Sequence, residues 1–239
     1  MYCPQNGWKG EFMKRTVIGI DVGGTTTKIV GFRKNDGGAM QLIAPQFVRA
    51  TDPMTSIYGA FGKFTAENGL ELADIDNILM TGAGSAVINK GIYNLKCNAV
   101  PEFSSSGIGG LYLSGLSEAI VVSMGTGTAL VRAKKEGNKY DIKYLGGTGV
   151  GGGTLIGLSK CLIGVDTVEH IEQLCREGDL DHVDLRIKDI SQTHTYHGIN
   201  ENLTASNFGK LSDSFGVNFI IPENSQFGTV IGAALNEEN

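Results

Sequence analysis

The stretch from Val17 to Lys28, Val-Ile-Gly-Ile-Asp-Val-Gly-Gly-Thr-Thr-Thr-Lys, constrains this chain more than any other. Its first part, Val17 to Val22, is a β-branched run that predicts a buried strand. The pair Gly23-Gly24 allows a tight turn, and successive backbone N–H groups in such a turn form a concavity that binds anions. The stretch therefore predicts a strand that ends at a bound anion.

The polar residues of this stretch suit a phosphate and a magnesium ion. Thr25, Thr26 and Thr27 offer hydroxyl donors, and Lys28 offers a positive charge. Asp21, at the end of the strand, is placed to hold Mg²⁺ through water, because Mg²⁺ keeps several of its waters. We interpret the stretch as a phosphate-and-magnesium hairpin; the alternative is an ordinary turn in a glycine-rich surface loop.

A second hairpin of the same layout is expected about 100 residues later. We interpret this spacing as a duplication of one unit and not as an array of short repeats. The β-branched strand Ala119 to Ser123 runs into Met124-Gly125-Thr126-Gly127-Thr128, and Ala129 to Ala133 continues extended. The repeat predicts two related lobes, each of which gives one phosphate-binding turn to a central cleft.

A third glycine-rich segment, Gly146 to Thr154, reads Gly-Gly-Thr-Gly-Val-Gly-Gly-Gly-Thr and leads into an expected helix over Leu155 to Ile163. Helix N-termini favour anions through their N–H groups and dipole, so this segment predicts a nucleotide contact. A flexible linker is the alternative, but a linker does not run directly into an apolar helix. The spacing Gly147-x-Gly149-x-x-Gly152 also fits a dinucleotide fingerprint, weakly, because we expect no long β-branched strand before it.

The remaining periodicity predicts further strands and helices. An expected strand, Ile75 to Thr81, precedes Gly82, and Val100-Pro101-Glu102-Phe103 leads into an expected helix. We also expect strands over Thr27–Arg33, Met40–Val48 (at a sheet edge because of Pro45) and Phe219–Pro222, and helices from Asp52-Pro53 to Asn68-Gly69 and over Gly82–Ser85 onward, Ser104–Leu116, Thr167–Arg176 and Thr229–Leu235.

Composition excludes several classes of protein. The net charge of −5 without a long basic run argues against a nucleic-acid partner. No apolar segment reaches the ~18 residues of a membrane span. Cys3, Cys97, Cys161 and Cys175 are scattered, which favours neither structural zinc nor a disulfide framework. We expect a cytoplasmic protein without a membrane association.

The hairpins and the glycine segment occur in order with Thr204-Ala205-Ser206-Asn207-Phe208-Gly209 and with Pro222-Glu223-Asn224 followed by Ile231-Gly232-Ala233-Ala234. Together they resemble the type II (eukaryotic-like) pantothenate kinases of the actin/Hsp70/sugar-kinase superfamily, over nearly everything from Met13 to Leu235. The resemblance implies an α/β protein with a two-lobed actin-like (ribonuclease H-like) ATPase fold. It also implies a homodimer that uses ATP and Mg²⁺ to phosphorylate pantothenate to 4'-phosphopantothenate, the first step of coenzyme A biosynthesis.

The resemblance also assigns residues. Glu102 matches the catalytic glutamate that takes the proton from the substrate hydroxyl. The nucleotide-binding positions are those of the first turn (Asp21, Gly23, Gly24, Thr25, Thr26, Thr27 and Lys28), those of the second turn (Gly125, Thr126 and Gly127) and those of the glycine loop (Gly151, Gly152, Gly153, Thr154, Leu155 and Ile156).

Two departures from the family pattern qualify this assignment. The family has an arginine before the glycine loop that grips the pantothenate carboxylate; here Tyr144 stands in its place, and Lys143 beside it offers only a point charge without a bidentate fork. Only about ten residues connect Gly209 to Phe219, where the family carries a helix, a strand, a nucleotide-base loop and another helix. A strand–helix–strand crossover alone needs roughly 30 residues, so this segment cannot fit.

We therefore expect an extension over 1–12, an N-terminal lobe over 13–117, and an abbreviated C-terminal lobe over 118–239 that lacks a segment near 211–215. The alternatives to a pantothenate kinase are another small-molecule kinase of the superfamily and a truncated nucleotide-binding pseudokinase. A dehydratase-activating ATPase would need clustered cysteines for an iron–sulfur centre, and the scattered ones argue against it.

Overall fold

The computed structural model describes residues 16–24, 26–34, 40–49, 52–88, 91–179, 182–190, 201–204 and 218–236. Thr25, the expected extension over 1–12, the Ala205–Gly209 motif and the expected gap near 211–215 lie outside these residues. The chain divides into two compact units. The first runs to Gly149 and resumes at Pro222, and the second comprises Val150–Ile221.

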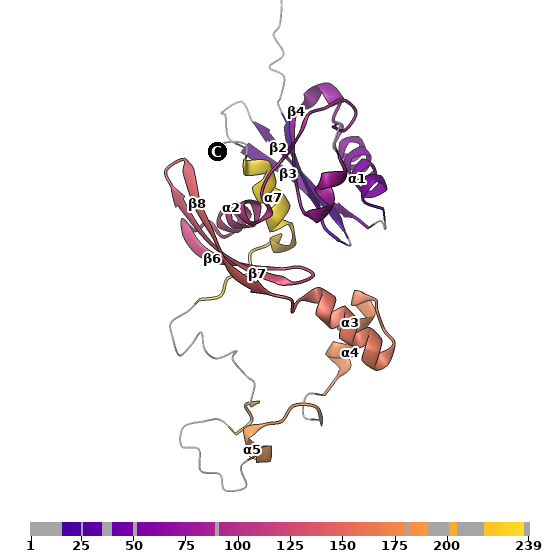
Figure 1. The fold of residues 1–239 in the computed structure, drawn as a ribbon, viewed down its shortest axis with the longest axis vertical. Helices are drawn as coiled ribbons and strands as arrows, with labels where there is room; N and C mark the ends of the chain where they lie inside the picture. Colours follow the sequence, from indigo (N-terminus) through magenta and orange to yellow (C-terminus); the bar gives the residue numbers. More distant parts are fainter. Residues whose placement is uncertain are drawn as a thin grey trace, which may run out of the picture. The chain divides into compact units, whose positions relative to one another are not determined.

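The first unit contains a five-stranded sheet in the order β3-β2-β1-β4-β5 (Figure 1). β1 (Thr16–Val22), β2 (Thr27–Lys34) and β3 (Met40–Val48) are antiparallel neighbours, whereas β4 (Ile75–Thr81) and β5 (Cys97–Ala99) continue the sheet in parallel. β3 is an edge strand, as Pro45 predicted, because proline cannot donate to a ladder. The pairing of β2 with β3 shifts between Ile29 and Gly31, opposite this proline.

Helix α1 (Pro53–Glu67) covers one face of this sheet. Asp52 caps it by accepting from the backbone N–H of Thr55 at 2.7 Å, as the Asp-Pro pair predicted. Its apolar stripe is buried against strand residues, and the stripe consists of Ile57, Ala60, Phe61 and Phe64. Two 3₁₀ turns flank β4: η1 (Leu72–Asp74) precedes it and η2 (Ala83–Val87) follows it. The sequence had predicted a helix after β4, and the structure has the shorter turn η2 there.

A three-stranded antiparallel sheet follows, in the order β6-β7-β8. Its strands are β6 (Glu118–Met124), β7 (Thr128–Glu136) and β8 (Lys139–Thr148). A strand, β8, precedes the glycine loop, although it is not the long β-branched strand whose absence the sequence predicted. β8 has few β-branched residues, and its strand form comes from pairing with β7 along its length. Because β8 is antiparallel to its neighbour, the dinucleotide fingerprint still lacks a βαβ unit.

Helices α2 (Glu102–Ser114) and α7 (Gly228–Leu235) pack against each other, α2 over β6–β8 and α7 over β1, β2 and β4. Figure 1 shows both helices between the two sheets. Their backbones approach closely because glycine faces glycine: a Cβ on Gly109 would lie 1.7 Å from the Gly228 carbonyl oxygen, and one on Gly232 would lie 1.7 Å from the Ser105 oxygen. A one-turn helix, η4 (Ser225–Phe227), precedes α7.

The second unit contains α3 (Gly152–Ile163), α4 (Val168–Glu177) and the short α5 (Ile187–Ile190), and α3 contacts α4. The expected strand at Phe219–Pro222 was wrong, because these residues pair with no strand among the residues that the structure describes. In the described part of the chain, no helix has both the length and the apolar character needed to cross a bilayer.

Candidate active site

Two polar residues, Asp21 and Thr81, lie side by side at the ends of parallel strands β1 and β4. Their neighbours Ile20, Val22 and Met80 belong to the core that packs on α1. Because side chains alternate along a strand, Asp21 and Thr81 point to the opposite face, where α7 packs.

The first residue of α2, Glu102, lies close to this strand end. The backbone N–H of Val100 donates to the Met80 carbonyl at 2.8 Å, which fixes the chain just before α2 beside the end of β4. The helix begins two residues earlier than the sequence had predicted, with Pro101 at its N-cap. Glu102 therefore lies in the first turn, where the helix dipole stabilises a carboxylate, and its side chain is exposed.

The electrostatics show that these groups interact. Burial raises the pKa of the Asp21 carboxyl group, because a charged carboxylate loses its hydration there. The Lys28 ammonium, directly opposite in the antiparallel pair, lowers that pKa, and the Glu102 carboxylate raises it again. Lys28 and Glu102 thus both act on the charge of Asp21 at the end of β1.

Gly82 makes room for this arrangement. It has φ +86°, and a Cβ there would lie 2.5 Å from the Val22 carbonyl oxygen and 2.7 Å from Asp21 Oδ1. Any side chain at this position would displace the carboxylate.

The first glycine turn joins β1 to β2 and is closed by a hydrogen bond from Gly23 N to Thr26 O at 3.0 Å. Gly23 and Gly24 are exposed, as an anion-binding turn requires. The expected hydroxyl role of Thr27 was wrong. Its side chain is 1% exposed, and its Oγ1 accepts from Ser56 Oγ at 2.7 Å inside the core.

The second glycine turn joins β6 to β7. Met124 pairs with Thr128, and Gly125 N donates to Gly127 O at 2.8 Å across the turn. Gly125 and Thr126 are exposed, and a Cβ on Gly127 would meet the Thr148 oxygen at 3.0 Å, so this turn lies against the end of β8. Both hairpins are thus present where the sequence predicted them; their phosphate contacts stay a prediction.

The glycine loop forms the start of α3 in the second unit. Gly151 is the N-cap, and its N–H donates to Thr154 Oγ1 at 3.3 Å. Gly152, Gly153 and Thr154 form the first turn, and Leu155 is 64% exposed beside the half-buried Ile156. A helix N-terminus with glycine at its first positions suits a phosphate, and the nucleotide role of these residues stays a prediction.

Sequence reasoning missed Thr81 as a site residue. Its side chain is 1% exposed, and among the described residues its Oγ1 has no hydrogen-bond partner. A buried hydroxyl without a partner costs about 1–3 kcal/mol, so such groups mark functional places. The available signal was its position, the last residue of a strand just before a glycine.

The oxygens at this strand end fit a magnesium ion better than a transition metal. The described residues hold no cluster of three His, Cys, Asp or Glu side chains that could bind a metal directly. One half-buried carboxylate, beside a hydroxyl that has no partner among the described residues, instead suits a hydrated Mg²⁺, which takes oxygen ligands and keeps several waters.

A cavity of about 620 Å³ opens at the start of α2, where Pro101 and Phe103 line it. Phe103 and Tyr144 form one wall as stacked rings, with centroids 4.3 Å apart and an interplanar angle of 14°. Its other lining residues include Ser104, Tyr140 and Ile142.

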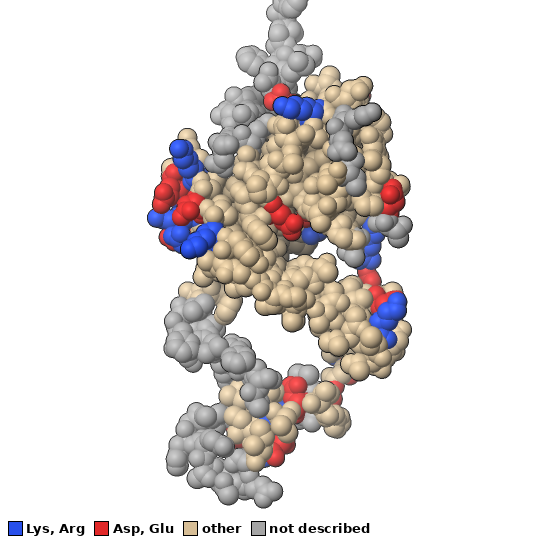
Figure 2. All heavy atoms as spheres, in the orientation of Figure 1, with Lys and Arg blue, Asp and Glu red and all other residues tan. Residues whose placement is uncertain are grey.

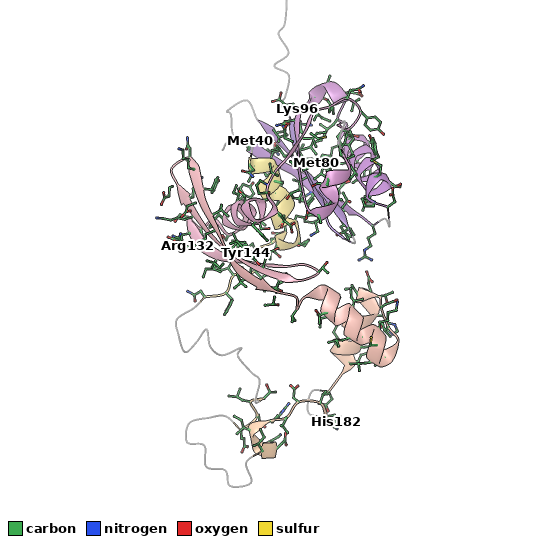
Figure 3. The ribbon with its side chains drawn as sticks, viewed as in Figure 1. Met40, Met80, Lys96, Arg132, Tyr144 and His182 are labelled. Atoms are coloured by element: carbon green, nitrogen blue, oxygen red, sulfur yellow. The ribbon has the colours of Figure 1, made fainter. Side chains whose placement is uncertain are left out.

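The suggested substitute cation, Lys143, lies on the wrong face of the sheet. It pairs with Arg132, whereas Tyr144 pairs with the fully buried Val131 on the face that packs on α2. Arg132 and Tyr144 are labelled in Figure 3. The expectation that Lys143 could replace the family's arginine at the Tyr144 position is therefore wrong.

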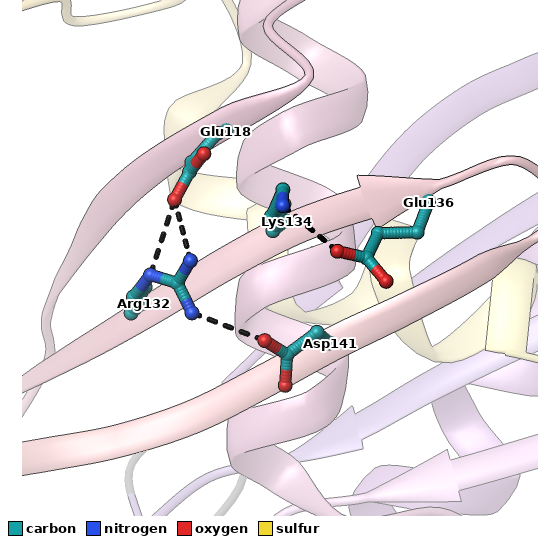
Figure 4. A network of polar contacts seen from close by, with 5 residues as sticks. All are labelled: Glu118, Arg132, Lys134, Glu136 and Asp141. Carbon is teal, nitrogen blue, oxygen red and sulfur yellow. Dashed lines mark hydrogen bonds and ion pairs between the residues drawn. The ribbon is translucent and has the colours of Figure 1, made fainter.

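The opposite face of this sheet carries charges of both signs, visible over β6–β8 in Figure 2. Arg132 donates to Glu118 at 2.6 and 3.1 Å and to Asp141 at 3.0 Å, and Lys134 pairs with Glu136 at 2.8 Å (Figure 4). The hydrogen bonds that Glu118 accepts from the guanidinium raise the pKa of Arg132. The exposed network has its charges already paired, so we assign it no part in the site.

Comparison with known proteins gives consistent sequence matches. The Fumble family matches residues 115–218. A type II pantothenate kinase of Bacillus cereus is 32% identical over 219 residues, covering 83% of this chain and 67% of the relative. A type II pantothenate kinase of Staphylococcus haemolyticus is 30% identical over 210 residues, covering 84% of this chain and 70% of the relative. The chain thus spans about two thirds of the length of the curated relatives it matches, 67% of the B. cereus protein.

Among solved structures, component A of (R)-2-hydroxyglutaryl-CoA dehydratase from Acidaminococcus fermentans has a TM-score of 0.59 at 15% identity, over 92% of this chain and 96% of that one. The activator of 2-hydroxyisocaproyl-CoA dehydratase from Clostridium difficile, with bound ADPNP, has a TM-score of 0.56 at 14% identity, over 92% and 93%. At this identity the likeness shows the fold alone, and it confirms the predicted actin-like α/β ATPase fold with a smaller second part.

Proposed function

Because the chain belongs to the type II pantothenate kinase family and is a kinase, we propose that it transfers the γ-phosphoryl group of ATP to the primary hydroxyl of pantothenate, which gives 4'-phosphopantothenate and ADP. The observation that carries the proposal is that Lys28 and Glu102 both act on the charge of Asp21 at one strand end. Phosphoryl transfer needs positioning, charge neutralisation and a group that orients the nucleophile, and these residue types supply all three.

The proposed roles follow from exposure and charge. The exposed carboxylate of Glu102 accepts the proton of the acceptor hydroxyl. As the proton leaves, the hydroxyl oxygen bonds to the γ-phosphorus, and the bond between that phosphorus and ADP breaks. The backbone N–H groups of the two glycine turns bind phosphate oxygens, and Lys28 attracts them. Asp21 would hold the water shell of Mg²⁺, which neutralises phosphate charge when bound, and the buried Thr81 hydroxyl oxygen, which has no partner among the described residues, would accept from one of those waters.

Other features belong to the same proposal. We propose that the protein is a homodimer in the cytoplasm. We also propose that its two lobes are residues 13–117 and 118–239; these bounds differ from those of the compact units, which divide after Gly149 and after Ile221. Three large apolar side chains on β6 support an association surface, because Ile120, Val122 and Met124 are 61%, 43% and 76% exposed on the edge strand of their sheet.

A coupled assay of ADP release tests the proposal. Purified protein with ATP and Mg²⁺ is supplied with pantothenate and, separately, with a panel of sugars and other small alcohols. We expect ADP release to depend on pantothenate and the product to carry one phosphate by mass. ATP binding without turnover on any acceptor would instead identify a pseudokinase, and turnover on a panel compound alone would identify another small-molecule kinase.

A further inference from the structure

The helix that carries Glu102 is joined to α7 by a hydrogen bond between two side chains. The hydroxyl oxygens of Ser106 in α2 and Thr229 in α7 lie 3.0 Å apart, and either of them can be the donor. Ser106 is 4% exposed and Thr229 is half-buried, so water competes little for this contact. In the described part of the chain, no other side-chain hydrogen bond links these two helices.

The remaining contact between α2 and α7 does little to fix how far one helix slides along the other. Helices usually interlock through ridges of side chains that fit into grooves. Here the backbones meet at glycines, and Gly109 faces the carbonyl oxygen of Gly228. Glycine brings the helices close but contributes no ridge. A hydrogen bond depends on both distance and angle, so the Ser106–Thr229 pair sets the register of α2 on α7.

Ser106 lies one helical turn behind Glu102 on the same face of α2. The two residues are four positions apart, and residues at this spacing lie one above the other on a helix. Side chains in a helix lean toward its N-terminus, so the Ser106 hydroxyl lies over the turn that bears Glu102. Because both residues belong to one continuous helix, a shift of α2 at Ser106 moves Glu102 with it.

The same part of α7 also packs on the strand that carries Asp21. A Cβ on Gly19, two residues before Asp21, would lie 2.5 Å from the Val230 carbonyl oxygen, so β1 and α7 are in close contact there. Val230 follows Thr229 directly in α7. The hydrogen bond thus ties α2 to the stretch of α7 that meets β1, and it fixes Glu102 relative to the end of that strand.

We propose that the Ser106–Thr229 hydrogen bond holds α2 in one register on α7, and that these two residues thereby position the Glu102 carboxylate for the acceptor hydroxyl. The inference rests on the proposed kinase function for the role of Glu102. A general base must lie within hydrogen-bond reach of the proton that it takes, and a misplacement of about 1 Å can cost roughly 10²-fold in rate. The pair therefore supports turnover and adds nothing to nucleotide binding.

Hydrogen exchange tests the register without any need for turnover. Ser106→Ala removes one hydroxyl, and Thr229→Val removes the other while keeping a branched side chain. In both variants we expect the backbone amides of residues 102–109 to exchange about twofold to tenfold faster than in the wild type, relative to those of α1, as the loss of one hydrogen bond predicts. Unchanged exchange in both variants would overturn the proposal.

A matched control comes from the other end of α2. The Ser114 hydroxyl donates to the Gly110 carbonyl oxygen at 2.7 Å within the helix and has no bond to α7. Ser114→Ala therefore removes a helix hydroxyl without touching the register, and it should leave the amides of residues 102–109 at their wild-type exchange rates. Exchange that rises equally in Ser114→Ala and Ser106→Ala would refute a specific role for the bond to α7.

Steady-state kinetics with ATP and pantothenate then tests the effect on Glu102. Ser106→Ala and Thr229→Val should each lower kcat about tenfold or more, while the dissociation constant of Mg²⁺·ATP stays within about twofold of the wild type. Thr229→Ser keeps the hydroxyl and should retain the wild-type kcat. The double variant should be no slower than the slower single variant, because both changes remove the same bond. A lower Tm with unchanged kcat would show a merely structural role.

A second cycle shows whether the loss acts through Glu102. In the Glu102→Gln background no base is left to position, so Ser106→Ala should have no further effect on turnover measured with radiolabelled ATP. A further tenfold loss in that background would remove Glu102 from the explanation.

The two proposals fail separately. Faster exchange in Ser106→Ala and Thr229→Val, together with a wild type that phosphorylates no acceptor, would refute the kinase function and leave the register of α2 on α7 explained by this bond. A wild type that phosphorylates pantothenate, with the same kcat in both variants, would refute the positioning role alone.

Discussion

Replacing Thr81 by valine should stabilise the empty protein and weaken its response to nucleotide. The hydroxyl of Thr81 is buried without a partner among the described residues, which costs about 1–3 kcal/mol. Valine has the same branched shape and suits a strand, so the substitution removes this cost without leaving a cavity. We expect the free energy of unfolding of the ligand-free protein to rise by about 1 kcal/mol, or roughly 2–4 °C in Tm for a chain of this size.

The bound state should respond in the opposite direction. If the hydroxyl oxygen accepts from a magnesium-bound water, its loss removes a hydrogen bond strengthened by the charge of the cation, worth about 1.5–3 kcal/mol. The affinity for Mg²⁺·ATP should then fall roughly tenfold to hundredfold. Thermal melts over a range of Mg²⁺·ATP concentrations measure both quantities, because ligand stabilisation grows as RT ln(1 + [L]/Kd).

The control is Thr81→Ser, which keeps the hydroxyl and loses only a methyl group. It should be less stable than the wild type by about 1 kcal/mol and should keep the wild-type dependence of Tm on nucleotide. The reasoning fails if Thr81→Val melts below the wild type without ligand, since the hydroxyl then has a partner. It also fails if Thr81→Val and the wild type gain the same Tm from nucleotide.

Three further predictions concern the same unit. Glu102→Gln should lower turnover on pantothenate about 10²–10⁴-fold while calorimetry still detects ATP binding, because glutamine cannot accept the proton; near-native turnover would exclude this base. Burial raises the pKa of Asp21 above 3.8, so the folded state binds the carboxyl proton more tightly than the unfolded chain does. The stability gained in this way is present below the unfolded-state pKa, and it is lost as the pH rises through the folded-state pKa. Asp21→Asn should therefore flatten the fall in urea-measured stability across that window and also abolish magnesium-dependent activity; an unchanged pH profile would contradict the assigned cause. Gly109→Ala should destabilise the protein by about 1–3 kcal/mol or more, because its Cβ would lie 1.7 Å from the Gly228 oxygen. Gly59→Ala, on the exposed face of α1, is the control: its Cβ meets no atom within 4 Å, so this variant should not be destabilised. Equal losses of Tm in the two variants would refute the close packing of α2 on α7.

The sequence by itself determined the local elements and the two glycine turns. The β-branched run over Val17–Val22, the Asp52-Pro53 cap and the Asn68-Gly69 stop are local signals, and β1 and α1 lie where these signals place them. The run from Ile75 to Thr81 likewise became β4 with the predicted bounds. Such signals act over a few residues, so they are complete within the sequence that carries them.

The tertiary structure decided which side chains meet. A strand's alternation shows that Thr27 and Lys28 point apart, but only the packing of α1 decides that the Thr27 hydroxyl is buried against Ser56. In the same way, only the pairing of β8 with β7 separates Tyr144 from Lys143, and β8 itself had no strong local signal. The neighbourhood of Asp21 depends on contacts among β1, β4 and α2, whose residues are far apart in sequence, so no local pattern could have identified Thr81 as its neighbour.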